Sequence, residues 1–136
     1  MAPLDFETPE AALASLEDAY RREDVDAAVA AKDFVYEARA MLLALENMEG
    51  SVDEDVVKQT AEVLELSFRT FTEQNGFPNF KDVRCTVISK KDLREDLVEL
   101  VEECVSQDGS KSQEILHAAK NGRGWHIVVM PPRRSR

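Results

Sequence analysis

The chain has 136 residues with an apolar fraction of 43%, which fits one globular domain with a hydrophobic core. Its 17 basic and 27 acidic side chains give a net charge of −10, which argues against a nucleic-acid partner because phosphates attract Lys and Arg. The apolar runs are shorter than the ~20 residues of a membrane span, and the N-terminus does not read as a secretion signal. We therefore expect a cytoplasmic protein without a membrane partner, with residues 1–136 forming a single domain.

The negative charge is concentrated in the first part of the chain. Residues 1–80 carry 18 acidic and 6 basic side chains, a net charge of −12, whereas residues 81–136 carry 9 acidic and 11 basic ones, a net charge of +2. The simplest interpretation is a solvated surface, and the alternative is a site that attracts a basic protein. The residues proposed for such a site are Glu17, Asp18, Glu23, Asp24, Asp26, Asp53, Glu54 and Asp55.

Helical periodicity dominates residues 8–50. Thr8 and Pro9 form a helix start, because Thr8 can cap the first turn and proline suits the first helical position. Apolar residues at intervals of three and four extend this helix to about Arg22. Asp24 then caps a second helical segment, which either continues as one helix to about residue 46 or breaks near residues 32–33.

A third helix and a strand follow. Ser51 and Glu54 form a capping box, in which each side chain can bond to a free backbone amide of the first turn. The apolar stripe of this helix is predicted to run from Val56 to Phe71, and the helix is predicted to end at Gly76. Residues 77–80 are expected to form a loop. Residues 83–88 then alternate as a strand with one face inward.

Residues 97–129 are interpreted as three antiparallel strands joined by two tight turns. The pairs 108–109 (Asp-Gly) and 121–122 (Asn-Gly) suit such turns, because a two-residue hairpin loop requires positive φ, which Gly and Asn tolerate. Trp125 opens the last strand and is most simply a core anchor. Periodicity alone favours a helix for residues 91–105, whereas Val98, Leu100 and Cys104 would share one face of a strand.

Four stretches carry a resemblance to a known family. They read TPEAALASLEDAY (8–20), EDVDAAV (23–29), DGS (108–110) and GWHIVV (124–129). With the order of predicted elements, they resemble the nuclear transport factor two-like superfamily over residues 8–130. The resemblance implies an α+β fold, with three N-terminal helices packed on a curved, cone-like antiparallel sheet of about four strands. It favours a strand within residues 91–105. Residues 34–46 depart from it, because they read as helix where many members have a strand pair.

The resemblance leaves two functions open, because this fold serves enzymes, binding modules and dimerisation domains. Similarity to bacterial immunity proteins implies a non-catalytic acidic protein that binds and neutralises a basic toxin. The alternative is a small-molecule binder, or an isomerase- or dehydratase-like enzyme that uses the cone cavity. Its candidate catalytic residues are Tyr20, His117 and His126. Its candidate pocket-lining residues are Tyr20, Phe34, Trp125 and His126. A homodimer through the sheet face is compatible with either function.

Several observations weigh against catalysis. The strand acids, which include Glu102, follow amphipathic patterns that predict solvent exposure, so a carboxylic acid to accompany Tyr20 is missing. His117 and His126 fall on predicted buried faces, where a histidine is more often a core residue than a catalytic one. We expect no cofactor and no metal. The basic tail, residues 131–136, is expected to be frayed.

The two cysteines are expected to be buried, reduced thiols. Two are too few for a disulfide scaffold or a zinc site, and reduced thiols are the default in the cytoplasm. A bridge between Cys85 and Cys104 would require their strands to be adjacent.

Overall fold

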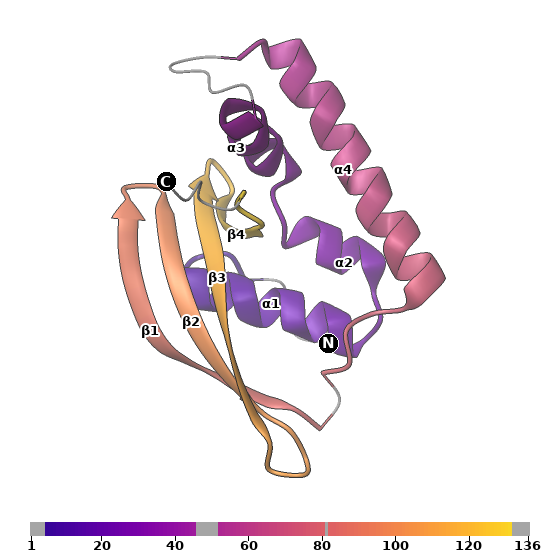
Figure 1. Ribbon diagram of the computed structural model, residues 1–136, viewed down its shortest axis with the longest axis vertical. Coiled ribbons are helices and arrows are strands. Elements are labelled where there is room, and N and C mark those ends of the chain that lie inside the picture. Colours follow the sequence, from indigo (N-terminus) through magenta and orange to yellow (C-terminus); the bar gives the residue numbers. More distant parts are fainter. Residues whose placement is uncertain (1–4, 46–51, 81, 132–136) are drawn as a thin grey trace.

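The computed structural model describes residues 5–45, 52–80 and 82–131 as a helical half followed by a sheet. The helices are α1 (Pro9–Arg21), α2 (Val25–Ala30), α3 (Phe34–Leu45) and α4 (Glu54–Asn75). The strands β1 (Arg84–Arg94), β2 (Leu97–Val105), β3 (Lys111–Asn121) and β4 (Gly124–Val128) form one antiparallel sheet in that order. The sheet curves around α1, and α4 lies on the far side of α2 and α3 (Figure 1). The predicted α+β class and curved four-stranded sheet are confirmed, with four helices in place of three. Within the described ranges, no helix has the length and apolar character needed to cross a membrane.

The predicted starts of the first two helices are confirmed. The Thr8 hydroxyl accepts a hydrogen bond from the Ala11 amide at 3.0 Å, and the Asp24 carboxylate accepts one from the Ala27 amide at 3.1 Å. Each side chain thereby satisfies a backbone donor that has no partner inside the helix.

The second helical segment breaks in two at Asp33. The Asp33 carboxylate caps α3 by accepting the Tyr36 amide at 2.9 Å, and it also accepts the Asn121 side-chain amide at 2.8 Å. Just before this cap, the Ala31 carbonyl accepts the Ile127 amide of β4 at 2.9 Å. The break therefore lets the chain between α2 and α3 attach to the edge of the sheet. Residues 34–45 are helical, as the sequence indicated.

The third predicted helix is α4, and its described cap is Asp53. The Asp53 carboxylate accepts the Asp55 amide at 2.8 Å. The predicted cap Ser51 lies outside the described residues, so the capping box itself is not part of the described structure. The helix ends at Gly76 with a φ of 79°, as predicted.

Residues 91–105 form a hairpin rather than a helix. Residues 91–94 complete β1, a turn follows at residues 95–96, and β2 begins at Leu97. Alternate residues of β2, namely Val98, Leu100 and Glu102, are buried on the face of the sheet that contacts α1. This tertiary burial outweighs the helical spacing of the apolar residues. The strand alternative is confirmed for β2, and the turn at 95–96 was not predicted.

The two later hairpin loops differ in detail from the predicted two-residue turns. In the β2–β3 loop, the Ser106 amide donates to the Ser110 carbonyl at 2.9 Å, which leaves three residues in the loop with Gly109 at a φ of 87°. In the β3–β4 loop, Asn121 pairs with Gly124 across two residues. The positive φ there, 107°, falls on Gly124 instead of on residues 121–122.

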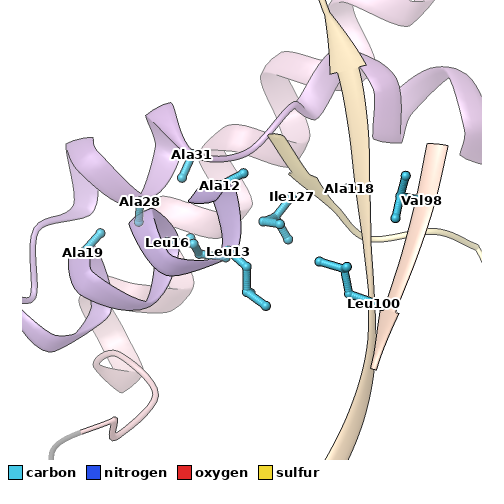
Figure 2. Packing of buried hydrophobic residues seen from close by; sticks show 10 residues of the cluster. All are labelled: Ala12, Leu13, Leu16, Ala19, Ala28, Ala31, Val98, Leu100, Ala118 and Ile127. Atoms are coloured by element: carbon cyan, nitrogen blue, oxygen red, sulfur yellow. The ribbon is translucent and has the colours of Figure 1, made fainter. Parts of the chain in front are cut away.

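The main core fills the space between α1 and the inner face of the sheet, which we define as the face that contacts α1. Leucines of α1 meet aliphatic side chains of β2, β3 and β4, while alanines allow α1 and α2 to approach closely (Figure 2). The buried residues of this cluster are Ala12, Leu13, Leu16, Ala19, Ala28, Ala31, Val98, Leu100, Ala118 and Ile127. A second cluster, centred on Phe34 and Val57, joins α3 to α4. A third, which includes Leu97 and Val128, lies on the opposite, outer face.

Candidate functional site

Tyr20 lies on α1, where its ring packs among aromatic residues of the loop before β1. Its ring centroid is 5.8 Å from that of Phe80 and 5.9 Å from that of Phe77. Burial raises the pKa of Tyr20 to about 12, so the hydroxyl stays protonated at neutral pH. The residue is half-buried and packs against the core beneath the inner face of the sheet.

The two histidines lie on the outer face of the sheet, not with Tyr20. The register pairs His117 with Val128, and Ala119 with His126, so the histidines occupy neighbouring positions on adjacent strands. His117 Nε2 lies 3.7 Å from the Glu99 carboxylate. His126 is 2% exposed, and its ring stacks on Phe6 with a centroid distance of 4.6 Å. The structure therefore does not bring the three candidate catalytic residues into one site.

The four candidate pocket-lining residues are also separated. Phe34 is buried between α3 and α4, with its ring 5.8 Å from Phe68. Trp125 packs against the main core, whereas His126 lies on the other side of β4 because successive strand residues alternate. The apolar core occupies the inner face where these residues were predicted to line a cavity.

One of the eight predicted acidic surface residues is not on the surface. Glu17 is 7% exposed, because it lies four residues after the buried Leu13 and shares its face of α1. The expectation that Glu17 faces a partner is therefore wrong. The other seven are exposed or half-buried: Asp18, Glu23, Asp24, Asp26, Asp53, Glu54 and Asp55.

These seven acids form two groups. The first lies at α1 and α2, where Arg22 pairs with Asp18 at 2.9 Å and with Asp24 at 3.2 Å. Arg69 of α4 joins this group by pairing with Asp26 at 2.9 Å. The second group, residues 53–55, begins α4, about 24 Å from Arg69 at 1.5 Å per helical residue. A partner that contacts both groups must therefore extend along α4.

A row of exposed apolar side chains runs along α4 between these groups. Val63, Leu66 and Phe71 are 61%, 65% and 61% exposed. The helical period places them with Val56 and the uncharged polar residues of the same face. We call this surface the α4 outer face, and it comprises Val56, Gln59, Val63, Leu66, Ser67, Thr70, Phe71 and Gln74. The predicted apolar stripe ran from Val56 to Phe71, and these two end residues are exposed. Val57 and Ala61, which also belonged to the predicted stripe, are buried where α4 packs on α3.

A polar cluster lies on the inner face of the sheet, beside the main core. The β1–β2 register places Cys85 opposite Cys104 with their Cα atoms 4.1 Å apart, and the two form a disulfide. The expectation of reduced thiols is therefore wrong, and it no longer supports a cytoplasmic location. Glu102 is 3% exposed, so its predicted solvent exposure is also wrong. Its position follows from the alternation of β2, which also turns Leu100 and Cys104 inward.

Glu17 completes this cluster from α1. Burial, followed by a hydrogen bond with Glu102 and the charge of Glu102, raises the pKa of Glu17 to about 8. Two carboxyl groups can form such a bond only when one of them is protonated. We call these residues the Glu–Cys cluster: Glu17, Cys85, Glu102 and Cys104. One donor atom from each lies within 4.8 Å of all the others. The sequence signal was an acidic residue inside each of two apolar patterns.

Comparisons with known proteins bear on the fold. No protein-family profile matches the chain, and no curated protein matches it. A solved Thiobacillus denitrificans structure, described as a calcium/calmodulin-dependent protein kinase type II association domain, is 13% identical with a TM-score of 0.52, covering 93% of this chain and 94% of its own. A ketosteroid isomerase-like protein from Erwinia carotovora is 18% identical with a TM-score of 0.45, and the match covers 88% of this chain and 87% of that protein. The association-domain match covers nearly the whole of both chains and shows that they share a fold.

Proposed function

We propose that this protein is a non-catalytic binding protein whose partner is a basic protein, most simply a bacterial toxin that it neutralises as an immunity protein. The observation that carries this proposal is the α4 outer face, with Val63, Leu66 and Phe71 exposed in one uncharged row. A patch of large apolar side chains bordered by polar ones has the make-up of a protein-binding surface.

The charges around this face favour a basic partner. Asp55, Glu62 and Glu73 are exposed and follow one another at helical intervals along one border of the row. Arg69, on the same side, is paired with Asp26 and Glu65. With a net charge of −12 over residues 1–80, this half of the protein attracts a basic surface and repels an acidic one.

The enzyme alternative has less support. Tyr20 lies apart from His117 and His126, and Leu13 and Leu100 belong to the core that fills the inner face. A general acid–base site requires its groups to be within hydrogen-bonding reach of one substrate.

The outer face of the sheet favours a second copy of the chain as a further partner. Ile115 and Val129 are 64% and 66% exposed there. They border an open hollow of about 700 Å³, whose lining also includes Leu97, His117 and Met130. This face and α4 lie on opposite sides of the molecule (Figure 1), so a homodimer leaves the α4 outer face free.

The test uses the toxin encoded beside the gene for this protein. Toxin expressed alone should stop cell growth, and co-expression of this protein should restore it. Leu66→Asp should weaken toxin binding by at least about thirtyfold, because a charge replaces a central apolar contact. Val35→Asp is the matched control, since Val35 is also a helical, exposed apolar residue but lies on α3.

The affinity should also fall steeply with added salt, because salt screens the attraction between opposite charges. Equal affinity at low and high salt would contradict the role of the acids. Full protection by Leu66→Asp, or the lack of any toxin gene beside this one, would contradict the proposed function.

A further inference from the structure

We propose that the Glu–Cys cluster is a redox-controlled binding site for one zinc-like divalent cation. In the reduced protein, the thiolates of Cys85 and Cys104 and the carboxylates of Glu17 and Glu102 would be its four ligands. The disulfide form described above is the closed state of this site. The site is separate from the α4 outer face and independent of the proposed partner.

The four donors are already gathered from three elements. Glu17 comes from α1, Cys85 from β1, and Glu102 and Cys104 from β2. Their donor atoms lie within 4.8 Å of one another. Around a tetrahedral zinc ion, with Zn–S near 2.3 Å and Zn–O near 2.0–2.2 Å, ligand atoms are about 3.3–3.8 Å apart. Once the S–S bond is broken, small side-chain rotations would satisfy this geometry.

A buried, unsatisfied carboxylate oxygen favours cation binding at this cluster. Glu17 is 7% exposed, and its Oε2 atom is buried without a hydrogen-bond partner. The nearby Arg21 guanidinium does not supply one, because it lies 3.4 Å from the carbonyl oxygens of Phe80 and Val83. A second buried carboxyl, Glu102, lies beside Glu17. In the disulfide form, a proton held between the two groups offsets the cost of placing them together in the interior, and in the reduced form a cation would replace that proton.

The donor types select the ion. Two thiolates with two carboxylates suit zinc, whereas magnesium and calcium prefer oxygen ligands alone. A disulfide lacks the thiolates, so oxidation removes half of the ligands. Cys85 and Cys104 are half-buried, and Cys85 lies near the start of β1, which gives an ion and a reductant a route to the sulfurs.

The redox step balances with a dithiol as the reductant. The S–S bond between Cys85 and Cys104 breaks, and each sulfur gains one electron and one proton. The dithiol supplies both electrons and both protons and becomes a disulfide. Binding of the divalent ion then releases the two thiol protons and the proton held between Glu17 and Glu102 to solvent.

Cobalt(II) is the probe, because thiolate coordination gives it a distinct absorption band. The full chain, reduced with a phosphine under anaerobic conditions, should bind one Co²⁺ with this band, and Zn²⁺ should displace it. The oxidised chain should show no band.

Glu17→Gln and Glu102→Gln should each lower the affinity at least about tenfold. Both variants keep the disulfide, so their folding can be checked by circular dichroism before reduction. Cys104→Ser should lose most of the band.

Glu103→Gln is the matched control, because Glu103 is next to Glu102 but on the other face of β2. It should bind Co²⁺ as the wild type does. Equal affinity in the reduced and oxidised chains would overturn the proposal. So would unchanged affinity in both Glu17→Gln and Glu102→Gln, since the ion would then be held elsewhere. Neither outcome bears on toxin binding through the α4 outer face.

Discussion

At the scale of single residues, His126 links protein stability to pH. Burial lowers the pKa of His126 below 6.5, although its hydrogen bond to the Gly124 carbonyl oxygen acts in the opposite direction. Nδ1 lies 3.2 Å from that oxygen, so the neutral ring donates from Nδ1. In the unfolded chain the ring takes up a proton near its ordinary pKa of about 6.5. Below that pH the unfolded state therefore binds more protons than the folded state, and folding weakens as pH falls.

We predict that the contribution of His126 to the free energy of unfolding decreases on acidification below pH 6.5, whereas Glu17, whose pKa is raised to about 8, contributes a slope of the opposite sign. One proton sets a limiting slope of about 1.4 kcal/mol per pH unit for this residue. His126→Gln should remove that part of the slope, as measured by urea unfolding between about pH 7.5 and about pH 5. His117→Gln is the control, because His117 is more exposed and lies beside Glu99. The same slope in His126→Gln and the wild type would contradict the prediction.

The residues that sequence patterns placed wrongly are polar groups inside apolar patterns. Glu17 follows Leu13 by one helical turn, and Glu102 follows Leu100 by one strand repeat, so periodicity points both inward. Both acids were nevertheless predicted to be exposed, because acidic side chains usually lie on the surface. Which two such groups meet depends on how α1 crosses the sheet, and residue spacing does not encode that crossing. The disulfide depends in the same way on the β1–β2 register.

At the scale of elements, Gly124 attaches the N-terminal segment to β4. The Trp125 amide donates to the Phe6 carbonyl oxygen at 2.8 Å, and a Cβ atom on Gly124 would overlap that same oxygen. The φ of 107° at Gly124 is also one that residues with side chains rarely adopt. Both effects follow from the position of the β3–β4 turn next to Phe6.

Gly124→Ala should therefore lower the free energy of unfolding by more than the ~1–3 kcal/mol that an unfavourable φ alone costs. Gly109→Ala is the matched control. Its φ is 87°, but no atom lies within 4 Å of the added Cβ, so only the backbone effect remains. Denaturant unfolding of both variants measures the difference. If Gly109→Ala were as destabilising as Gly124→Ala, contact with Phe6 would not be the cause.

Elements with strong local signals could be predicted from the sequence, and those without could not. Thr8 and Asp24 cap helices as expected because an N-cap acts on amides two or three residues away. The β1–β2 turn at residues 95–96 was missed because it contains Glu-Asp, with no Gly or Asn to mark it. Residues 97–105 have helical spacing in the sequence, but they form a strand because they pair with β1 and β3.

At the scale of the whole molecule, the resemblance predicted the layers but not the inside of the cone. The sheet, the α1–α3 layer and α4 follow one another across the molecule (Figure 1). Whether the sheet encloses a pocket depends on the size of the side chains between it and α1. Here Leu13, Leu16, Leu100 and Ile127 occupy that space (Figure 2). The two apolar faces left exposed, on α4 and on the outer sheet, are separate and can be tested independently.

We predict that the protein is a homodimer in solution and that Ile115 lies in its interface. Ile115 is 64% exposed, and the outer sheet face around it offers an apolar surface to a second copy. A stable dimer should bury more than about 1,000 Å².

Ile115→Asp would place an unpaired charge in that contact, so it should weaken dimerisation at least about tenfold. Sedimentation equilibrium should then give a monomer mass for Ile115→Asp and a dimer mass for Leu66→Asp. Toxin binding should instead be weakened by Leu66→Asp and unchanged by Ile115→Asp, because Leu66 belongs to the α4 outer face. A wild-type protein that stayed monomeric at all concentrations would rule out the dimer.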